Sequence, residues 1–205
     1  MKKTIELILL FIVIPSSFLL DISPIIKSFT GLFGFIYVIY LSFWVEKIVL
    51  KKELSFSKFK LVSKTILIRF FVIAILTTSF LYLFDKENLF NVIIPKPALW
   101  ISFVLIYSVL SVIPQEFVYR SFFFQRYKPL FKNEFTFLLI NSLLFSFAHV
   151  WFRSWVVLGF TFVGSLLFNR TYKKTNSLLI LSIEHAIYGS WLYTVGYGEL
   201  FKFPI

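Results

Sequence analysis

The groups that can do acid-base chemistry in this chain are few and stand in apolar surroundings. The sequence contains only two histidines, His149 and His185, and both lie in apolar stretches, as do Glu116 and Glu184. An ionisable group at membrane depth costs at least about 2.5–3.5 kcal/mol on insertion scales, so those that remain usually face a bundle interior and serve function. A carboxylate and two imidazoles gathered there can activate water, bind a metal ion or relay protons.

Several neighbours have the spacing to support these groups. Arg120 follows Glu116 by four positions, so the two share a helical face and can pair, either as a structural ion pair or with the arginine contacting a substrate. Glu184 precedes His185 and points about 100° away around a helix, from where it can orient another histidine or act as a second acid. Phe145, four positions before His149, is interpreted as a buttress for that ring.

The composition indicates the solvent in which these groups must lie. Of 205 residues, 59% are apolar, 21% aromatic and 15% charged, whereas soluble domains have roughly 45–50% apolar and 25% charged residues. A water-soluble globular protein is therefore excluded, and we expect an integral membrane protein. Cysteine is absent, which excludes disulfides, thiolate metal sites and a cysteine nucleophile.

The apolar stretches predict an all-α fold, a polytopic bundle of about seven transmembrane helices. We expect residues 1–97 to form an N-terminal three-span region and residues 98–205 to form a core that carries the ionisable residues, with one membrane domain overall. The seven predicted spans cover residues 5–20, 29–45, 65–84, 98–124, 135–151, 155–168 and 177–195.

The net charge of +11 is interpreted as a topology signal and not as a nucleic-acid surface. Fifteen basic residues fall on one side of the predicted spans and five on the other. Since positive residues accumulate on the cytoplasmic side, the bias predicts an N-terminus inside. We expect a bacterial plasma (inner) membrane, with membrane lipid and a membrane-associated protein or peptide substrate as partners and no nucleic acid.

Distances along the helices predict that three of the groups share one depth. Glu116 lies 16 residues before Lys132, and His149 lies 17 residues after it, which is about 24 and 26 Å from that turn in an antiparallel pair of helices. His185 lies 12 residues beyond Lys173, about 18 Å along the last helix. Convergence of the three side chains in one cavity is therefore a hypothesis.

Three motifs in order resemble the CPBP family of CAAX proteases and bacteriocin-processing enzymes. They are residues 115–120, Q-E-F-V-Y-R; residues 145–149, F-S-F-A-H; and residues 184–189, E-H-A-I-Y-G. The family patterns are E-E-x-x-x-R, F-x-x-x-H and H-x-x-x-N, and the resemblance covers about residues 98–195.

This resemblance implies a polytopic α-helical enzyme that cleaves a peptide bond inside the membrane. In the family's mechanism, a carboxylate and the middle histidine polarise water, while the last histidine and an asparagine stabilise the oxyanion. By resemblance, His149 would position the water and His185 would donate to the oxyanion.

Two residues depart from the family pattern. The first glutamate of the pair is Gln115, whose amide cannot take a proton from water near neutral pH, so Glu116 or Glu184 would have to replace it as the base. The asparagine of the last motif is Gly189, which has no side-chain donor. The oxyanion would then depend on His185, on Ser190 or on a backbone amide.

These departures leave alternatives open. We expect no cofactor; the alternative is zinc bound by His149, His185 and Glu116, which matches a catalytic zinc shell but lacks a local H-E-x-x-H spacing. The alternative to a protease is a non-catalytic family member that acts as a membrane binding or bacteriocin immunity protein. A proton-coupled transporter is disfavoured because the sequence shows no inverted repeat.

Overall fold

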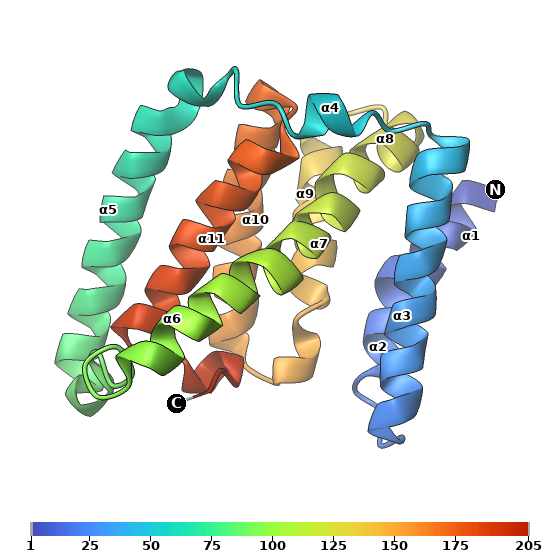
Figure 1. The fold of residues 1–205 in the computed structure, drawn as a ribbon. Helices are drawn as coiled ribbons and strands as arrows, with labels where there is room; N and C mark the ends of the chain where they lie inside the picture. The colour runs from blue at the N-terminus through green and yellow to red at the C-terminus, as the bar shows by residue number, and fades with distance from the viewer. Residues whose placement is uncertain (1, 205) are drawn as a thin grey trace. The chain divides into compact units, whose positions relative to one another are not determined.

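The protein is described by a computed structural model covering residues 2–204, so the terminal residues 1 and 205 of the two predicted regions lie outside the description. The described residues form helices of the α, π and 3-10 types and no strand, which confirms the all-α prediction. Figure 1 labels the α-helices. In chain order, the elements are α1 (Lys2–Ile8), η1 (Leu9–Val13), α2 (Ile14–Ser17), α3 (Pro24–Tyr40), η2 (Leu41–Val45), α4 (Leu50–Glu53), α5 (Phe59–Phe84), η3 (Lys86–Asn88), α6 (Pro97–Ile106), η4 (Tyr107–Val112), α7 (Ile113–Glu116), η5 (Phe117–Phe122), α8 (Phe123–Tyr127), η6 (Lys128–Leu130), α9 (Glu134–Phe147), η7 (Val150–Phe152), α10 (Trp155–Thr175), α11 (Leu178–Val195) and η8 (Glu199–Phe201).

Five helical segments of the described chain have the length and apolar composition needed to cross a membrane. Each overlaps one of the predicted spans. The two other predicted spans correspond to the short run α1–η1–α2 and to α10, both helical but outside this set, so the total of seven stays a prediction. The five segments are Pro24–Val45, Phe59–Phe84, Pro97–Leu130, Glu134–Phe152 and Leu178–Val195.

The chain divides into two compact units, each made of two separate segments. Unit 1 comprises Met1–Lys51 and Phe117–Arg170, and unit 2 comprises Lys52–Glu116 and Thr171–Ile205. The units therefore do not follow the order of the sequence. The boundary predicted at residue 97 divides the chain into a region without motifs and a region that contains all three motifs. This boundary stays a prediction.

Unit 1 is built around aromatic side chains. The ring of Phe11 is 2% exposed and makes edge contacts with Tyr119, Phe123 and Tyr127, at centroid separations of 5.2, 5.1 and 5.8 Å. Edge-to-face packing of this kind is favourable because the positive ring edge meets a negative ring face. These contacts hold the N-terminal helix against η5 and α8.

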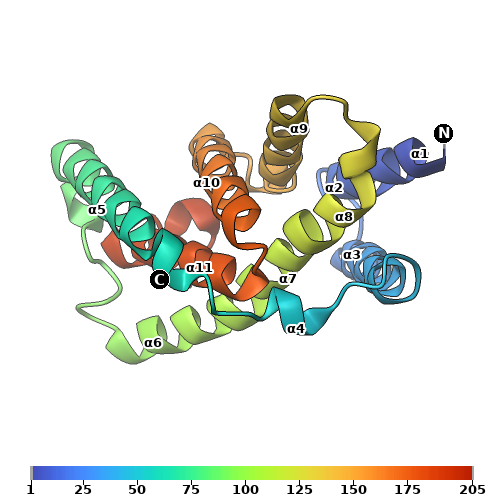
Figure 2. The same ribbon diagram turned by 90° about the horizontal axis from the view of Figure 1, so that it is seen from above.

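Unit 2 is built around α11. This helix contacts α5 on one side and the run α6–η4–α7 on the other, as Figures 1 and 2 both show. Ile180, Leu181 and Tyr193 of α11 are fully buried. The last α-helix, α11, is therefore the interior helix of this unit, which places Glu184 and His185 among the neighbouring helices.

Two π-helical turns precede prolines. Pro15 follows η1 and Pro114 follows η4, and in each case the residue four positions before the proline lies inside the π-helical turn. A proline in an α-helix has no N–H for that carbonyl and clashes with it, and a wider turn relieves both problems. Pro114 thereby changes the register between Tyr107 and Glu116 from that of a regular α-helix.

Polar side chains cap the N-termini of α9 and α11. Asn133 accepts hydrogen bonds from the backbone N–H of Phe135 at 2.7 Å, and Ser177 caps α11 by accepting from Ile180 at 3.2 Å. Helix α10 continues beyond the predicted span 155–168, through Lys173 to Thr175. The chain turns at Asn176, whose φ of 49° is left-handed, a conformation that asparagine tolerates.

An ionic cluster ties three segments of unit 1 together. The guanidinium of Arg126 donates to both carboxylate oxygens of Glu6 at 2.8 Å and to Glu46 at 2.7 Å. Tyr127 donates to Glu6 as well, at 2.8 Å. The side chains of Arg126 and Glu6 are each 12% exposed, so the charges are mostly withdrawn from water and depend on one another.

We predict that Arg126→Met destabilises the protein. Removing one partner of a mostly buried ion pair leaves the other charges uncompensated, at a cost of about 3 kcal/mol. The measurement is the melting midpoint of the purified protein in detergent, with Lys132→Met as the control because Lys132 is an exposed basic residue nearby in sequence. Equal midpoints for the two variants would contradict the role assigned to the cluster.

Candidate active site

Glu116 and His185 form the closest pair of chemically active groups in unit 2. Glu116 ends α7 and is fully buried, and His185 on α11 is 8% exposed. Nδ1 of His185 lies 2.6 Å from Oε1 of Glu116. A contact this short is typical of a charge-assisted hydrogen bond. The structure thus brings together two of the three residues that were predicted to converge.

The other nitrogen of the same imidazole faces a hydroxyl. Tyr107, the first residue of η4, places its hydroxyl 3.3 Å from Nε2 of His185. When Glu116 is ionised and accepts the Nδ1–H, Nε2 carries the lone pair and accepts from the tyrosine. The three groups form a row of carboxylate, imidazole and phenol within unit 2.

Glu184 has a different set of partners. Arg69 of α5 donates to its Oε1 at 2.9 Å, and the Tyr188 hydroxyl donates to the same oxygen at 2.9 Å. Arg69 also donates to Thr171. Glu184 is fully buried, so it acts as the counter-charge of an arginine that joins α5 to α11.

The two residues that depart from the family pattern are also in unit 2. The amide of Gln115 donates to Ser111 one turn earlier, at 2.7 Å. At Gly189, a Cβ atom would overlap the hydroxyl of Tyr107 and lie 2.7 Å from Cζ of its ring. Ser190 has a buried hydroxyl with no hydrogen-bond partner among the described residues.

Arg120 lies in unit 1 and is fully buried. Its guanidinium donates to the side-chain oxygen of Ser165 on α10 at 2.9 Å. It also lies over the rings of Phe145 and Phe168, at 4.6 and 5.6 Å from their centroids. Since a desolvated cation is stabilised by aromatic faces, these contacts fasten η5 to α9 and α10.

His149 also belongs to unit 1, where it follows α9. Its Nδ1 lies 2.8 Å from the carbonyl oxygen of Phe145, so the N–H of the neutral ring is fixed on Nδ1 and Nε2 carries the lone pair. The rings of Phe145 and Phe152 lie at centroid distances of 5.0 and 6.0 Å, which confirms Phe145 as a buttress. The convergence of His149 with Glu116 and His185 stays a prediction.

The segment that carries these residues matches a known family. Residues 97–191 match the family model described as type II CAAX prenyl endopeptidase Rce1-like. This segment is an Rce1-like domain of the CPBP family. Neither a curated protein nor a solved structure matches the chain.

The Rce1-like domain begins at the first residue of α6 and ends within α11, so it includes all three motifs. The family is one of CAAX-type proteases. Together with the apolar helices, this match makes the chain an integral membrane protein.

The ligands predicted for zinc are divided between the two units. Glu116 and His185 provide two of them in unit 2, while His149 lies in unit 1. Among the described residues, no three His, Cys, Asp or Glu side chains are grouped as a metal ion requires. The zinc alternative stays a prediction.

Tyr107 is not among the residues predicted from the sequence, although the sequence contains a signal for it. Tyr107, Ser111 and Gln115 follow one another at intervals of four in an otherwise apolar helix, which marks a polar stripe on one face. The partner of Glu184 was also missed. Arg69 is one of the few charges inside a predicted span, but only tertiary contact could connect α5 with α11.

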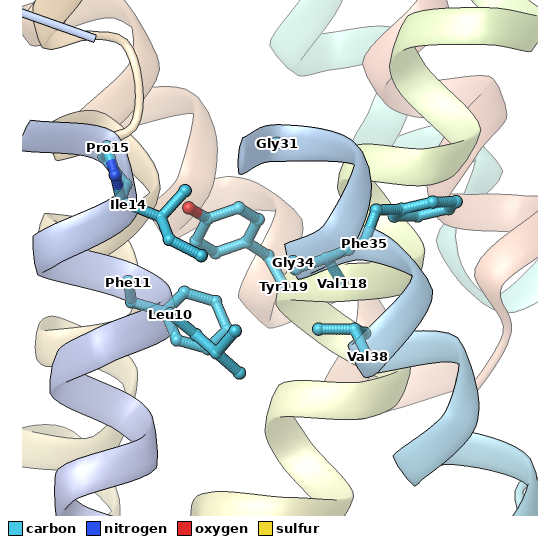
Figure 3. Close-up of a pocket in the computed structure, with 10 residues that line it drawn as sticks. All are labelled: Leu10, Phe11, Ile14, Pro15, Gly31, Gly34, Phe35, Val38, Val118 and Tyr119. Carbon is cyan, nitrogen blue, oxygen red and sulfur yellow. The ribbon is translucent and has the colours of Figure 1, made fainter. Parts of the chain in front are cut away.

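An apolar pocket of about 190 Å³ lies within unit 1, between α2 and α3. Its wall contains Gly31 and Gly34 of α3, and Figure 3 shows the Tyr119 hydroxyl beside Ile14. None of the lining residues is a carboxylate or a histidine. This pocket is therefore lined by no group that performs hydrolysis.

We predict that Arg69→Met destabilises the protein because it leaves the Glu184 carboxylate buried without its counter-charge, at a cost of about 3–5 kcal/mol. Replacing both partners, as in Arg69→Met with Glu184→Leu, should restore most of the loss. The melting midpoint in detergent measures both effects. A double variant as unstable as the single one would show that the two residues are not coupled.

Proposed function

We propose that the protein is an intramembrane endopeptidase of the CAAX-protease type, which hydrolyses a peptide bond with water activated by a carboxylate and histidine. The observation that carries the proposal is the 2.6 Å contact between Glu116 and His185, inside a domain of a protease family. A buried carboxylate that binds one nitrogen of an imidazole fixes the orientation of the ring and compensates its charge when the other nitrogen takes a proton.

The proton follows a defined route in this proposal. The water oxygen attacks the carbonyl carbon of the peptide, and Nε2 of His185 takes one proton from the water. Glu116, bound at Nδ1, compensates the positive charge of the ring. When the C–N bond breaks, the same proton passes to the leaving amine nitrogen, so the pair returns to its starting state.

His149 is proposed to position the attacking water. The support is its place in the F-x-x-x-H motif and its fixed tautomer: with Nδ1 held by the carbonyl of Phe145, Nε2 is the nitrogen that can accept a hydrogen bond from water. Arg120 and Glu184 are proposed as positioning residues. Their ionic and aromatic contacts fix the helices that carry the reacting groups.

Gln115 is proposed to have no part in the proton transfer. Its amide is bound to Ser111, and an amide does not accept a proton near neutral pH. The carboxylate of this motif is therefore proposed to be its second residue, Glu116, which holds the proton-accepting ring of His185. The reaction proposed here uses no cofactor.

The substrate is proposed to be a membrane-associated protein or peptide with a CAAX-type end, since the family model describes prenyl endopeptidases. We further propose a bacterial plasma (inner) membrane with the N-terminus inside, on the basis of the basic residues between the apolar segments. Membrane lipid surrounds the apolar helices.

We predict that Glu116→Gln, His185→Ala and His149→Ala each lower cleavage at least about 10²-fold, because each removes a group that holds or directs the transferred proton. The measurement is cleavage of a fluorescence-quenched farnesylated CAAX peptide by purified protein in lipid vesicles. Glu87→Gln is the control, since Glu87 is an exposed carboxylate. Membrane abundance of every variant is measured in parallel.

The alternative is a non-catalytic binding or bacteriocin immunity protein, which the departures at Gln115 and Gly189 favour. If the protein is a binding or immunity protein, the alanine variants of His149 and His185 should keep the binding or immunity function of the wild type. Cleavage by the wild type that survives in Glu116→Gln would contradict the proposed mechanism. Absence of cleavage by the wild type, with and without farnesyl on the peptide, would favour the alternative.

A further inference from the structure

A tyrosine occupies the space in which the family pattern has an asparagine side chain. Gly189 lies one helical turn after His185 on α11. A Cβ added there would overlap the Tyr107 hydroxyl and come within 2.7 Å of Cζ and 2.8 Å of Cε1. Distances below about 3 Å do not occur for carbon contacts of this kind, so no residue larger than glycine fits unless the tyrosine moves.

The tyrosine ring is held in this position by its neighbours. Phe103, one turn earlier, stacks on it at a centroid distance of 5.6 Å, and Phe203 contacts it at 5.6 Å. The His185 ring meets it edge-on at 6.2 Å. Aromatic contacts on several sides restrict the ring, so the direction of its hydroxyl is fixed before any substrate binds.

The hydroxyl is also in a chemically useful place. It lies 3.3 Å from Nε2 of His185, which is the nitrogen proposed to take a proton from water. A separation of 3.3 Å is longer than most hydrogen bonds between these atom types. Exchanging this partner for a substrate oxygen therefore costs little.

From this geometry we propose that Tyr107 is a catalytic residue: its hydroxyl donates a hydrogen bond to the carbonyl oxygen of the scissile peptide and stabilises the oxyanion. It replaces the side-chain donor that Gly189 cannot supply. The phenol keeps its proton throughout, so the step adds no charge and needs no further reactant. The inference rests on the proposed function because it assigns a role in that same reaction.

The first test compares Tyr107→Phe with Tyr82→Phe, which removes a hydroxyl from an exposed tyrosine. Loss of an oxyanion donor lowers kcat about 10²–10³-fold with little change in KM, because the interaction is made in the transition state. Tyr82→Phe should keep the activity of the wild type. A Tyr107→Phe variant that is equally active would overturn the proposal.

The second test exchanges the donor between the two positions. Gly189→Asn alone should be inactive because its side chain collides with the tyrosine ring. Adding Tyr107→Leu vacates the outer part of the ring and should restore activity above that of Tyr107→Phe. Recovery would be unexplained if the tyrosine were only structural. A double variant that folds but recovers nothing would overturn the proposal.

A readout independent of cleavage uses the histidines. The chain has only two, so ¹⁵N-histidine labelling gives two sets of ring signals, which His149→Gln assigns. Tyr107→Phe should shift the Nε2 signal of His185 and leave that of His149 unchanged. An unchanged His185 signal would overturn the placement of the hydroxyl. If Tyr107→Phe shifts the His185 signal but the wild type cleaves no peptide, the contact between the two side chains is upheld. The proposed function then fails, and the catalytic role of Tyr107 fails with it.

Discussion

The short contact between Glu116 and His185 is the constraint on which the rest of unit 2 depends. Two groups that are costly to place in an apolar bundle lower that cost by binding each other. Their contact requires α7 and α11 to approach closely, although 69 residues separate them in the chain. The interior position of α11 and the glycine opposite Tyr107 both serve this approach.

Charge inside the bundle is distributed so that most ionisable groups have structural duties. Glu184 is bound to Arg69, Arg120 is held by Ser165 and two phenyl rings, and Glu6 is bound to Arg126. Each of these charges faces a partner across a helix interface. In the pair of Glu116 and His185, the second nitrogen of the imidazole also lies near a hydroxyl, that of Tyr107.

The π-helical turns link local sequence to the candidate site. Pro114 has no N–H for the carbonyl of Leu110, four residues earlier, and the wider turn that contains Leu110 also includes Tyr107. The same proline lies two residues before Glu116. A single backbone constraint thereby sets the relative rotation of the two residues that approach His185 from this helix. Interruptions of this kind often occur at functional sites.

The all-α class and the apolar segments could be predicted from the sequence because composition and periodicity are local properties, and the motif residues could be identified by their resemblance to a known family. The sequence also placed Glu116 and His185 among the candidate groups and Phe145 beside His149. The partners became visible in the folded chain: Arg69 donates a hydrogen bond to Glu184, and Tyr107 occupies the space beside Gly189. These contacts join helices distant in the chain, and their register is shifted by π-helical turns. Spacing along one helix therefore could not predict them.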